Sequence, residues 1–170
     1  MTGDSVQQFL NGKWLAQTPS GTQRYATEVV KAAIGTRLAE RLTLVLPRDA
    51  TVPAWAGEIP VIRSRLRGTL FEQLALPWIS RHGHLYSLAG PAPLARRNQT
   101  VLLHDATPYR HPATFRRSFV LWYRLLYRVL SRRADRLITV SDFSRRELAD
   151  VLGIQAVSID VAPCGADHVP

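Results

Sequence analysis

The chain has 170 residues, of which 46% are apolar and 21% are charged, and these proportions exclude a disordered or fibrous protein. Lysine and arginine together number 22 against 13 aspartates and glutamates, which gives a formal net charge of +9. Because Lys13 and Lys31 are the only lysines, the positive charge is almost entirely guanidinium. Such groups bind nucleotides, sugar phosphates, nucleic acid or an anionic membrane, although an arginine-rich solvated surface explains the same excess.

The single cysteine, Cys164, excludes an internal disulfide and is compatible with a reducing compartment. Residues 1–5 lack the basic start of a secretory signal peptide, and no apolar run approaches the roughly 20 residues that span a bilayer. These features predict a cytoplasmic protein, with peripheral contact at the inner face of the cell membrane left open.

The predicted elements alternate between strands and helices. In chain order they are a strand over 6–10, a helix over 22–38, strands over 42–46 and 61–62, a helix over 71–82 that Pro77 can kink, strands over 85–88 and 100–103, a helix over 115–133, a strand over 137–140, a helix over 143–152 closed by Gly153, and a strand over 157–161. In the first helix, Tyr25, Val29 and the pair Ala32 and Ala33 recur at helical spacing. The strands are continuous apolar runs, as in sheets buried on both faces. The sequence therefore predicts an α/β, Rossmann-like three-layer domain with a mainly parallel sheet.

Polar residues gather where predicted strands end and helices begin, which is where open parallel sheets bind ligands. The first such place is Gly21, Thr22, Gln23 and Arg24, at the start of the first helix. Gly21 permits close backbone approach, the free N–H groups of the helix start favour an anion or a sugar hydroxyl, and Arg24 adds a charge. A plain loop capped by Ser20 or Thr22 accounts for the same residues.

His104 and Asp105 directly follow the strand over 100–103. A histidine there is placed to donate a hydrogen bond into a cleft, and the aspartate to orient it or to hold a hydroxyl. The alternative is a half-buried histidine with satisfied hydrogen bonds, followed by an aspartate that caps the next turn. No other histidine, cysteine or carboxylate lies at metal-ligand spacing nearby, so we expect no metal and no cofactor.

Ser141, Phe143 and Ser144 form a third such place, after the strand over 137–140. Ser144 and Glu147 have the S-x-x-E spacing of a capping box, which favours a structural role, and Ser141 is the residue best placed for a ligand. The sequence has no G-x-S-x-G elbow and no base near these serines, so a serine hydrolase is excluded.

The helix over 115–133 carries a narrow basic stripe beside a largely apolar remainder. The stripe consists of Arg117, Arg124, Arg128 and Arg132. Such a helix packs on a sheet with its arginines in solvent, or lies on an anionic bilayer with guanidinium groups at its edge. Aromatic residues are not interleaved with basic ones on any predicted strand, so nucleic acid is not an expected partner.

Four segments, taken in order, resemble the N-terminal domain of family 4 glycosyltransferases, which are retaining enzymes of the GT-B fold. They are GTQRYA at residues 21–26, LLHDATP at 102–108, ITVSDFSRREL at 138–148 and VAPCGAD at 161–167. The last is similar to the family's V-x-P-N-G-A-D, with Cys164 in place of the asparagine. Each segment alone is only weakly characteristic of the family. Together, in this order and at this spacing, the four segments extend over nearly the whole chain and make the resemblance specific.

The resemblance implies the acceptor-side half of a GT-B enzyme, which faces a donor-binding half across a cleft. It places the segment from Gly21 near the donor phosphates or the acceptor, His104 close to the transferring sugar, and Ser141 and Phe143 at the adjoining edge. It sets the domain at residues 1–163 and the start of an interdomain linker at 164–170. The donor-binding domain is then expected to be absent, and the chain alone to have little or no transferase activity.

The expected function is transfer of a hexosyl or similar sugar from a nucleotide-sugar donor to a glycan or lipid-linked acceptor, in polysaccharide or cell-envelope biosynthesis. A separate donor-binding domain would complete the enzyme. The alternative is a non-catalytic α/β module whose basic surface binds a membrane, a nucleotide or a partner enzyme.

Overall fold

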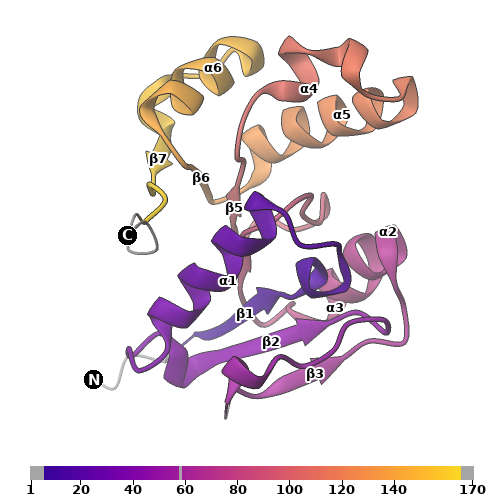
Figure 1. Cartoon of the computed structure of the whole chain (residues 1–170), viewed down its shortest axis with the longest axis vertical. Helices are drawn as coiled ribbons and strands as arrows, with labels where there is room; N and C mark the ends of the chain where they lie inside the picture. The colour runs from indigo at the N-terminus through magenta and orange to yellow at the C-terminus, as the bar shows by residue number, and fades with distance from the viewer. Residues whose placement is uncertain (1–5, 58, 166–170) are drawn as a thin grey trace.

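The computed structural model describes residues 6–57 and 59–165, in which one sheet is flanked by helices (Figure 1). The strands are β1 (Gln7–Asn11), β2 (Leu42–Leu46), β3 (Val61–Arg63), β4 (Gly83–Ser87), β5 (Gln99–Leu102), β6 (Arg136–Thr139) and β7 (Ile159–Val161). Their order across the sheet is β3-β2-β1-β4-β5-β6-β7, and every neighbouring pair is parallel. The predicted α/β, Rossmann-like fold is confirmed, and the sheet is parallel throughout.

Helices connect most of the successive strands. They are α1 (Gly21–Ala33), α2 (Gly68–Leu70), the π-helical η4 (Phe71–Ala75), α3 (Leu76–Ile79), α4 (Thr107–Arg110), α5 (Arg117–Arg133) and α6 (Asp142–Leu152). Short 3-10 turns occur at η1 (Lys13–Ala16), η2 (Ala39–Arg41), η3 (Ala54–Ala56), η5 (Pro112–Thr114) and η6 (Ala156–Ser158). Within the described residues, no helix is long and apolar enough to cross a membrane.

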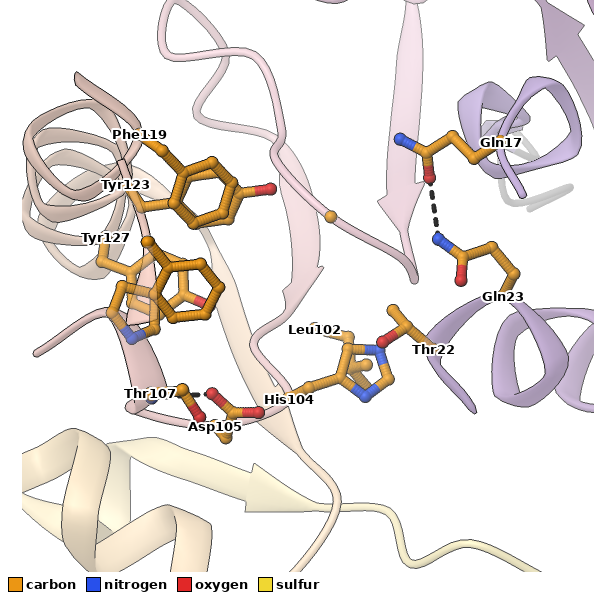
Figure 2. A pocket seen from close by; sticks show the side chains of 13 residues that line it. Gln17, Thr22, Gln23, Leu102, His104, Asp105, Thr107, Phe119, Tyr123 and Tyr127 are labelled. Carbon is orange, nitrogen blue, oxygen red and sulfur yellow. Dashed lines mark hydrogen bonds between the residues drawn. The ribbon is translucent and has the colours of Figure 1, made fainter. Parts of the chain in front are cut away.

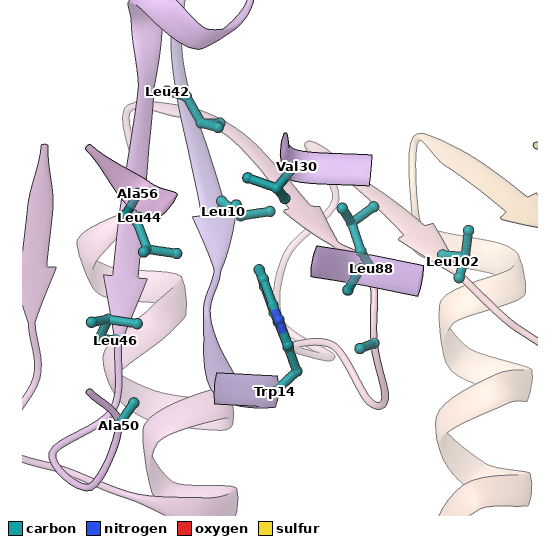
Figure 3. Close-up of a cluster of buried hydrophobic side chains, with 12 residues drawn as sticks. Leu10, Trp14, Val30, Leu42, Leu44, Leu46, Ala50, Ala56, Leu88 and Leu102 are labelled. Carbon is teal, nitrogen blue, oxygen red and sulfur yellow. The ribbon is translucent and has the colours of Figure 1, made fainter. Parts of the chain in front are cut away.

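Both faces of the sheet are covered by helices. Neighbouring residues of a strand point to opposite sides, so each strand contributes side chains to a cluster on either face. One face packs against α1 through Leu10, Leu44 and Val30, in the cluster that Figure 3 shows around Trp14. The other face packs against the α2–α3 segment, where Phe9 and Val45 of the strands meet buried apolar residues of that segment. Around β5 to β7, a further cluster joins the strands to α5 and α6.

The first helix is shorter than predicted. It ends at Ala33 instead of near residue 38, because Gly35 adopts a φ of +86° that a continuing helix does not contain. Ala26 and Val30 form its buried stripe, whereas Val29 is 37% exposed. The predicted helix is therefore present, and Tyr25 of the recurring apolar residues packs partly buried against the core.

The second predicted helix, over 71–82, begins and ends earlier in the structure and contains a π-helical segment. That segment, Phe71–Ala75, directly precedes the helical turn that holds Pro77. Proline has no N–H to donate to the carbonyl four residues earlier, so the regular α-helical pattern is interrupted near it. At the C-terminal end, β7 begins at Ile159 and not at residue 157, because residues 156–158 form a 3-10 turn that leaves Val157 82% exposed.

Candidate functional site

The strand order creates a crevice at the carboxyl ends of β1 and β4. From β1 the chain moves outward to β2 and β3, then returns to β4 on the other side of β1, so successive connections leave in opposite directions. A pocket of about 420 Å³ lies at this point. Thr22 and Gln23 line one side of it, His104 and Asp105 line another, and aromatic side chains of α5 line the third (Figure 2). The structure thus brings two of the predicted ligand-binding segments together.

The start of α1 is held in place by a capping arrangement. The backbone N–H of Ser20 donates to Oε1 of Gln23 over 3.1 Å, and Nε2 of Gln23 donates to Oε1 of Gln17 over 2.9 Å. Ser20 is therefore the N-cap of α1; the sequence had offered Ser20 or Thr22 for this role. Thr22 and Gln23 line the pocket, while Gly21 and Arg24 line a neighbouring depression on α1.

His104 is half-buried at the end of β5. Its Nε2 lies 3.2 Å from the carbonyl oxygen of Leu88, and its ring meets the ring of Tyr25 edge-on, with centroids 5.5 Å apart. Burial lowers the pKa of His104 below its ordinary value of 6.5, against smaller opposing effects of the Leu88 carbonyl and Asp105. A carbonyl only accepts, so the neutral ring carries its proton on Nε2 and keeps Nδ1 as an acceptor.

Asp105 caps the turn that follows it, which is one of the two roles that the sequence left open. Its Oδ1 accepts a hydrogen bond from the N–H of Thr107 over 2.7 Å, at the start of α4. The side chain is exposed and also lines the pocket, so capping does not remove it from the site. Whether Asp105 acts on a substrate stays a prediction.

The third predicted segment lies apart from this pocket. Ser141 caps α6 by accepting a hydrogen bond from the N–H of Ser144 over 3.1 Å, and Phe143 is 67% exposed. The expected capping box between Ser144 and Glu147 was wrong, because Glu147 instead pairs with Arg110 over 2.6 Å. Phe143 and Ser144 line a small depression beside Asp105.

The comparison with protein families identifies the family of this chain. The family model described as Glycosyltransferase Family 4 matches residues 20–169. The chain belongs to glycosyltransferase family 4. The resemblance inferred from the four sequence segments is therefore confirmed.

A solved structure supports the fold of this family 4 domain. The crystal structure of Alr3699/HepE from Anabaena, in complex with UDP and glucose, matches with a TM-score of 0.58 at 16% sequence identity. The match covers 96% of this chain and 45% of that chain, so the domain spans less than half the length of HepE. At this identity the similarity establishes the shared fold. No curated protein sequence matches the chain significantly.

Sequence reasoning missed one wall of the pocket in the family 4 domain. Phe115, which precedes α5, and Phe119, Tyr123 and Tyr127 of α5 follow one another at intervals of four residues and line the pocket. Their spacing is visible in the sequence, but the sequence analysis did not single it out. Burial raises the pKa of Tyr123 to about 12, so its hydroxyl is neutral at physiological pH.

A buried ion pair beneath the β1 end of the sheet was also missed. Nζ of Lys13 lies 2.6 Å from Oε2 of Glu72, whose side chain is fully buried. Oε1 of Glu72 has no hydrogen-bond partner among the described residues. Nothing in the sequence connects two residues so far apart in the chain. Within the described residues, no group of three or more metal-binding side chains is close enough to hold a metal ion.

Proposed function

We propose that this domain is the acceptor-side half of a GT-B glycosyltransferase, which transfers a sugar from a nucleotide-sugar donor to a glycan or lipid-linked acceptor. Its setting would be polysaccharide or cell-envelope biosynthesis. The observation that carries the proposal is the pocket at the strand-order reversal, where His104 and the start of α1 face the same space. Parallel α/β sheets bind their ligands at such a reversal.

The residues at this pocket fit two tasks of sugar transfer. The N–H groups of the first turn of α1 that the Ser20–Gln23 capping box does not use favour a phosphate or a sugar hydroxyl. The neutral ring of His104 offers Nδ1 as an acceptor for a hydroxyl of the transferring sugar, because its Nε2–H is committed to the Leu88 carbonyl. Sugar transfer depends on positioning the reactants and on neutralising the departing diphosphate.

The second half of the site is proposed to come from a donor-binding domain outside residues 1–170. The match to HepE, which covers 45% of that chain, supports this division. In this proposal residues 1–163 form the acceptor-side domain, and residues 164–170 begin the connection to the donor side. Arg24, Ser141 and Phe143 are then candidates for contacts near the edge of the cleft and not within the pocket.

The outer face of α5 supports peripheral contact with the inner face of the cell membrane. Leu121 and Leu125 are 68% and 50% exposed on this face. Arg117, Arg128 and Arg132 are exposed along the same face. Apolar side chains that insert between lipid tails, with guanidinium groups at their edge, suit an anionic bilayer.

The proposed contact of this pocket with the phosphate and sugar of the donor is tested with the purified chain and UDP-glucose. Titration followed by ¹⁵N NMR should shift the amides of Thr22 and Gln23 and the ring resonances of His104, with little or no release of UDP. His104→Ala should weaken the shifts at the pocket, while His82→Ala, which removes an exposed histidine at the far end of β4, should not.

Two results would contradict the proposal. Shifts confined to surfaces away from α1 and His104 would remove the pocket from donor binding. Steady release of UDP by the chain alone would show that no second domain is needed for turnover.

A further inference from the structure

The α2–α3 segment presents large apolar side chains to solvent. α2, η4 and α3 follow one another without a break, and on their inner side Phe71 and Leu76 are fully buried against the sheet. On the outer side Leu70 is 58% exposed, Leu74 is 60% exposed and Trp78 is 68% exposed. These three residues, spaced by four positions, form what we call the outer ridge of the segment.

The π-helical η4 aligns the outer ridge. An α-helix has roughly 3.6 residues per turn, so residues four and eight positions further on move steadily around its axis. The turns of a π-helix contain more residues than those of an α-helix, which reduces this drift. Leu70, Leu74 and Trp78 therefore share the side opposite Phe71 and Leu76, as their exposure shows.

Polar contacts on the inner side hold the segment in this orientation. Nε2 of Gln73 donates to the carbonyl oxygen of Ala92 over 3.2 Å, and Oε1 of Gln73 accepts from the N–H of Leu94 over 3.0 Å. The next residue, Glu72, pairs with Lys13. Because these contacts fix the inner side, rotation of the segment cannot bury the outer ridge.

The charges around the outer ridge are positive. Arg65 and Arg67 precede the segment, Arg81 follows it, and all three are exposed. Glu72 is the only acidic residue of the sequence between positions 59 and 104, and it is buried. The guanidinium of Arg81 lies 4.3 Å from the centroid of the Trp78 ring. The surface that covers the ridge is therefore expected to be apolar within and anionic at its boundary.

We propose that the outer ridge inserts into an anionic lipid bilayer, with Trp78 in the headgroup layer. Leucines that enter the acyl region, tryptophan at the interface and arginines on lipid phosphates are the usual parts of an interfacial helix. A fluid lipid layer receives a protruding ridge without a groove of matching shape. An acidic protein partner would need such a groove, so the lipid surface is the occupant that this ridge fits.

The segment lies on the same face of the sheet as α5. Leu85 of β4 packs with Phe71 of the segment, and Val101 of β5 packs in the cluster that includes α5. Val101 pairs with Ser87, which lies two residues after Leu85, so Leu85 and Val101 point to one face. The inference therefore deepens the membrane contact of the proposed function, on which it rests, and assigns it a second element.

The test is the fluorescence of Trp78 on vesicles of phosphatidylcholine with and without phosphatidylglycerol. The spectrum of the native chain minus that of Trp78→Phe isolates the emission of Trp78. With phosphatidylglycerol present, this emission should shift to shorter wavelength and should be quenched by lipids brominated on the acyl chain. Replacing Leu70 and Leu74 by serine should weaken partitioning about tenfold. Replacing Ile34 and Leu38 by serine, which removes apolar side chains exposed near the end of α1, should leave it unchanged.

Three results would overturn the inference. The first is binding to anionic vesicles with no shift or quenching of Trp78, which would leave the outer face of α5 as the membrane contact. The second is equal partitioning of the Leu70 and Leu74 double variant and the native chain. The third is no binding to either kind of vesicle, which would remove membrane contact from the proposed function as well and leave a protein partner for the ridge. Sugar transfer fails or stands separately, because its test uses UDP-glucose without lipid. Circular dichroism melts establish that the variants fold.

Discussion

At the scale of single residues, the ionisation of Glu72 affects the stability of the folded state. Burial raises the pKa of Glu72 from 4.5 to about 7, and the charge of Lys13 and its hydrogen bond to Glu72 offset part of that rise. The raised pKa shows that desolvation of the carboxylate outweighs its pairing. The pair thus holds η1 to the π-helical segment without being a strong source of stability.

The first prediction concerns the dependence of stability on pH. Between pH 4.5 and about 7, Glu72 ionises in the unfolded chain but keeps its proton in the folded one. The free energy of unfolding should therefore fall as the pH rises through this window, by about 3 kcal/mol at most. Glu72→Gln should remove this part of the pH dependence. Urea unfolding of both proteins across the window checks the difference, and parallel curves for the two would contradict it.

His104 shifts in the opposite direction for the same physical reason. Burial disfavours the charged form of either group, so it raises the pKa of an acid and lowers that of a base. His104 is therefore neutral at physiological pH, and its Nε2–H remains committed to the Leu88 carbonyl. The nitrogen left for a substrate is Nδ1, which accepts a hydrogen bond from a sugar hydroxyl.

At the scale of elements, β1 and β4 pair closely at the centre of the sheet. Gly83 begins β4 opposite Gln7 of β1. A Cβ atom at this position would overlap the carbonyl oxygen of Gln7 and would lie 2.7 Å from Cε2 of Phe9. Backbone and a packed ring give way less easily than the end of a flexible side chain. Glycine is therefore needed here for close approach.

The second prediction tests that pairing. Gly83→Ala should lower the free energy of unfolding by about 1–3 kcal/mol, because the added methyl group overpacks the strand pair. Gly21→Ala is the matched control, since a Cβ there has no heavy atom within 4 Å, and it should be neutral or stabilising by up to about 1 kcal/mol. Thermal and urea unfolding give both values. A Gly83→Ala protein as stable as the control would refute the packing argument.

The sequence predicted elements best where a single local cause determines them. The β2 strand was predicted to the residue because Leu42–Leu46 is buried along its whole length and Pro47 follows it. The end of α1 was missed because a left-handed glycine, Gly35, stops it before the apolar pattern fades. Strand order was not predictable, since it depends on pairing between segments far apart in the chain.

The candidate site was predictable where it follows strand ends. Thr22, Gln23 and His104 were found because polar residues after buried strands meet at one edge of a parallel sheet. Ser144 was misassigned because the S-x-x-E pattern fits it, while the structure begins the helix one position before Phe143 and uses Ser141 as the cap. The Lys13–Glu72 pair carries no local signal at all.

At the scale of the whole molecule, α5 links the pocket to the outer surface. Its inner side carries Phe119, Tyr123 and Tyr127, which line the pocket, and its outer side carries Leu121 and Leu125 among exposed arginines. If the outer side rests on a bilayer, the pocket lies one helix diameter, roughly 10 Å, from the lipid headgroups. That distance suits an acceptor whose sugar is attached to a membrane lipid.

The third prediction tests this arrangement with vesicles. The chain should sediment with vesicles that contain phosphatidylglycerol but not with pure phosphatidylcholine, and added salt should weaken binding because it screens the arginines. Replacing Leu121 and Leu125 by serine should reduce partitioning about tenfold, since inserted leucines add apolar burial to the charge attraction. Replacing Val52 and Val157, which are exposed elsewhere, is the matched control and should change nothing. If both double variants bind like the native chain, the attraction is purely electrostatic and α5 does not enter the bilayer.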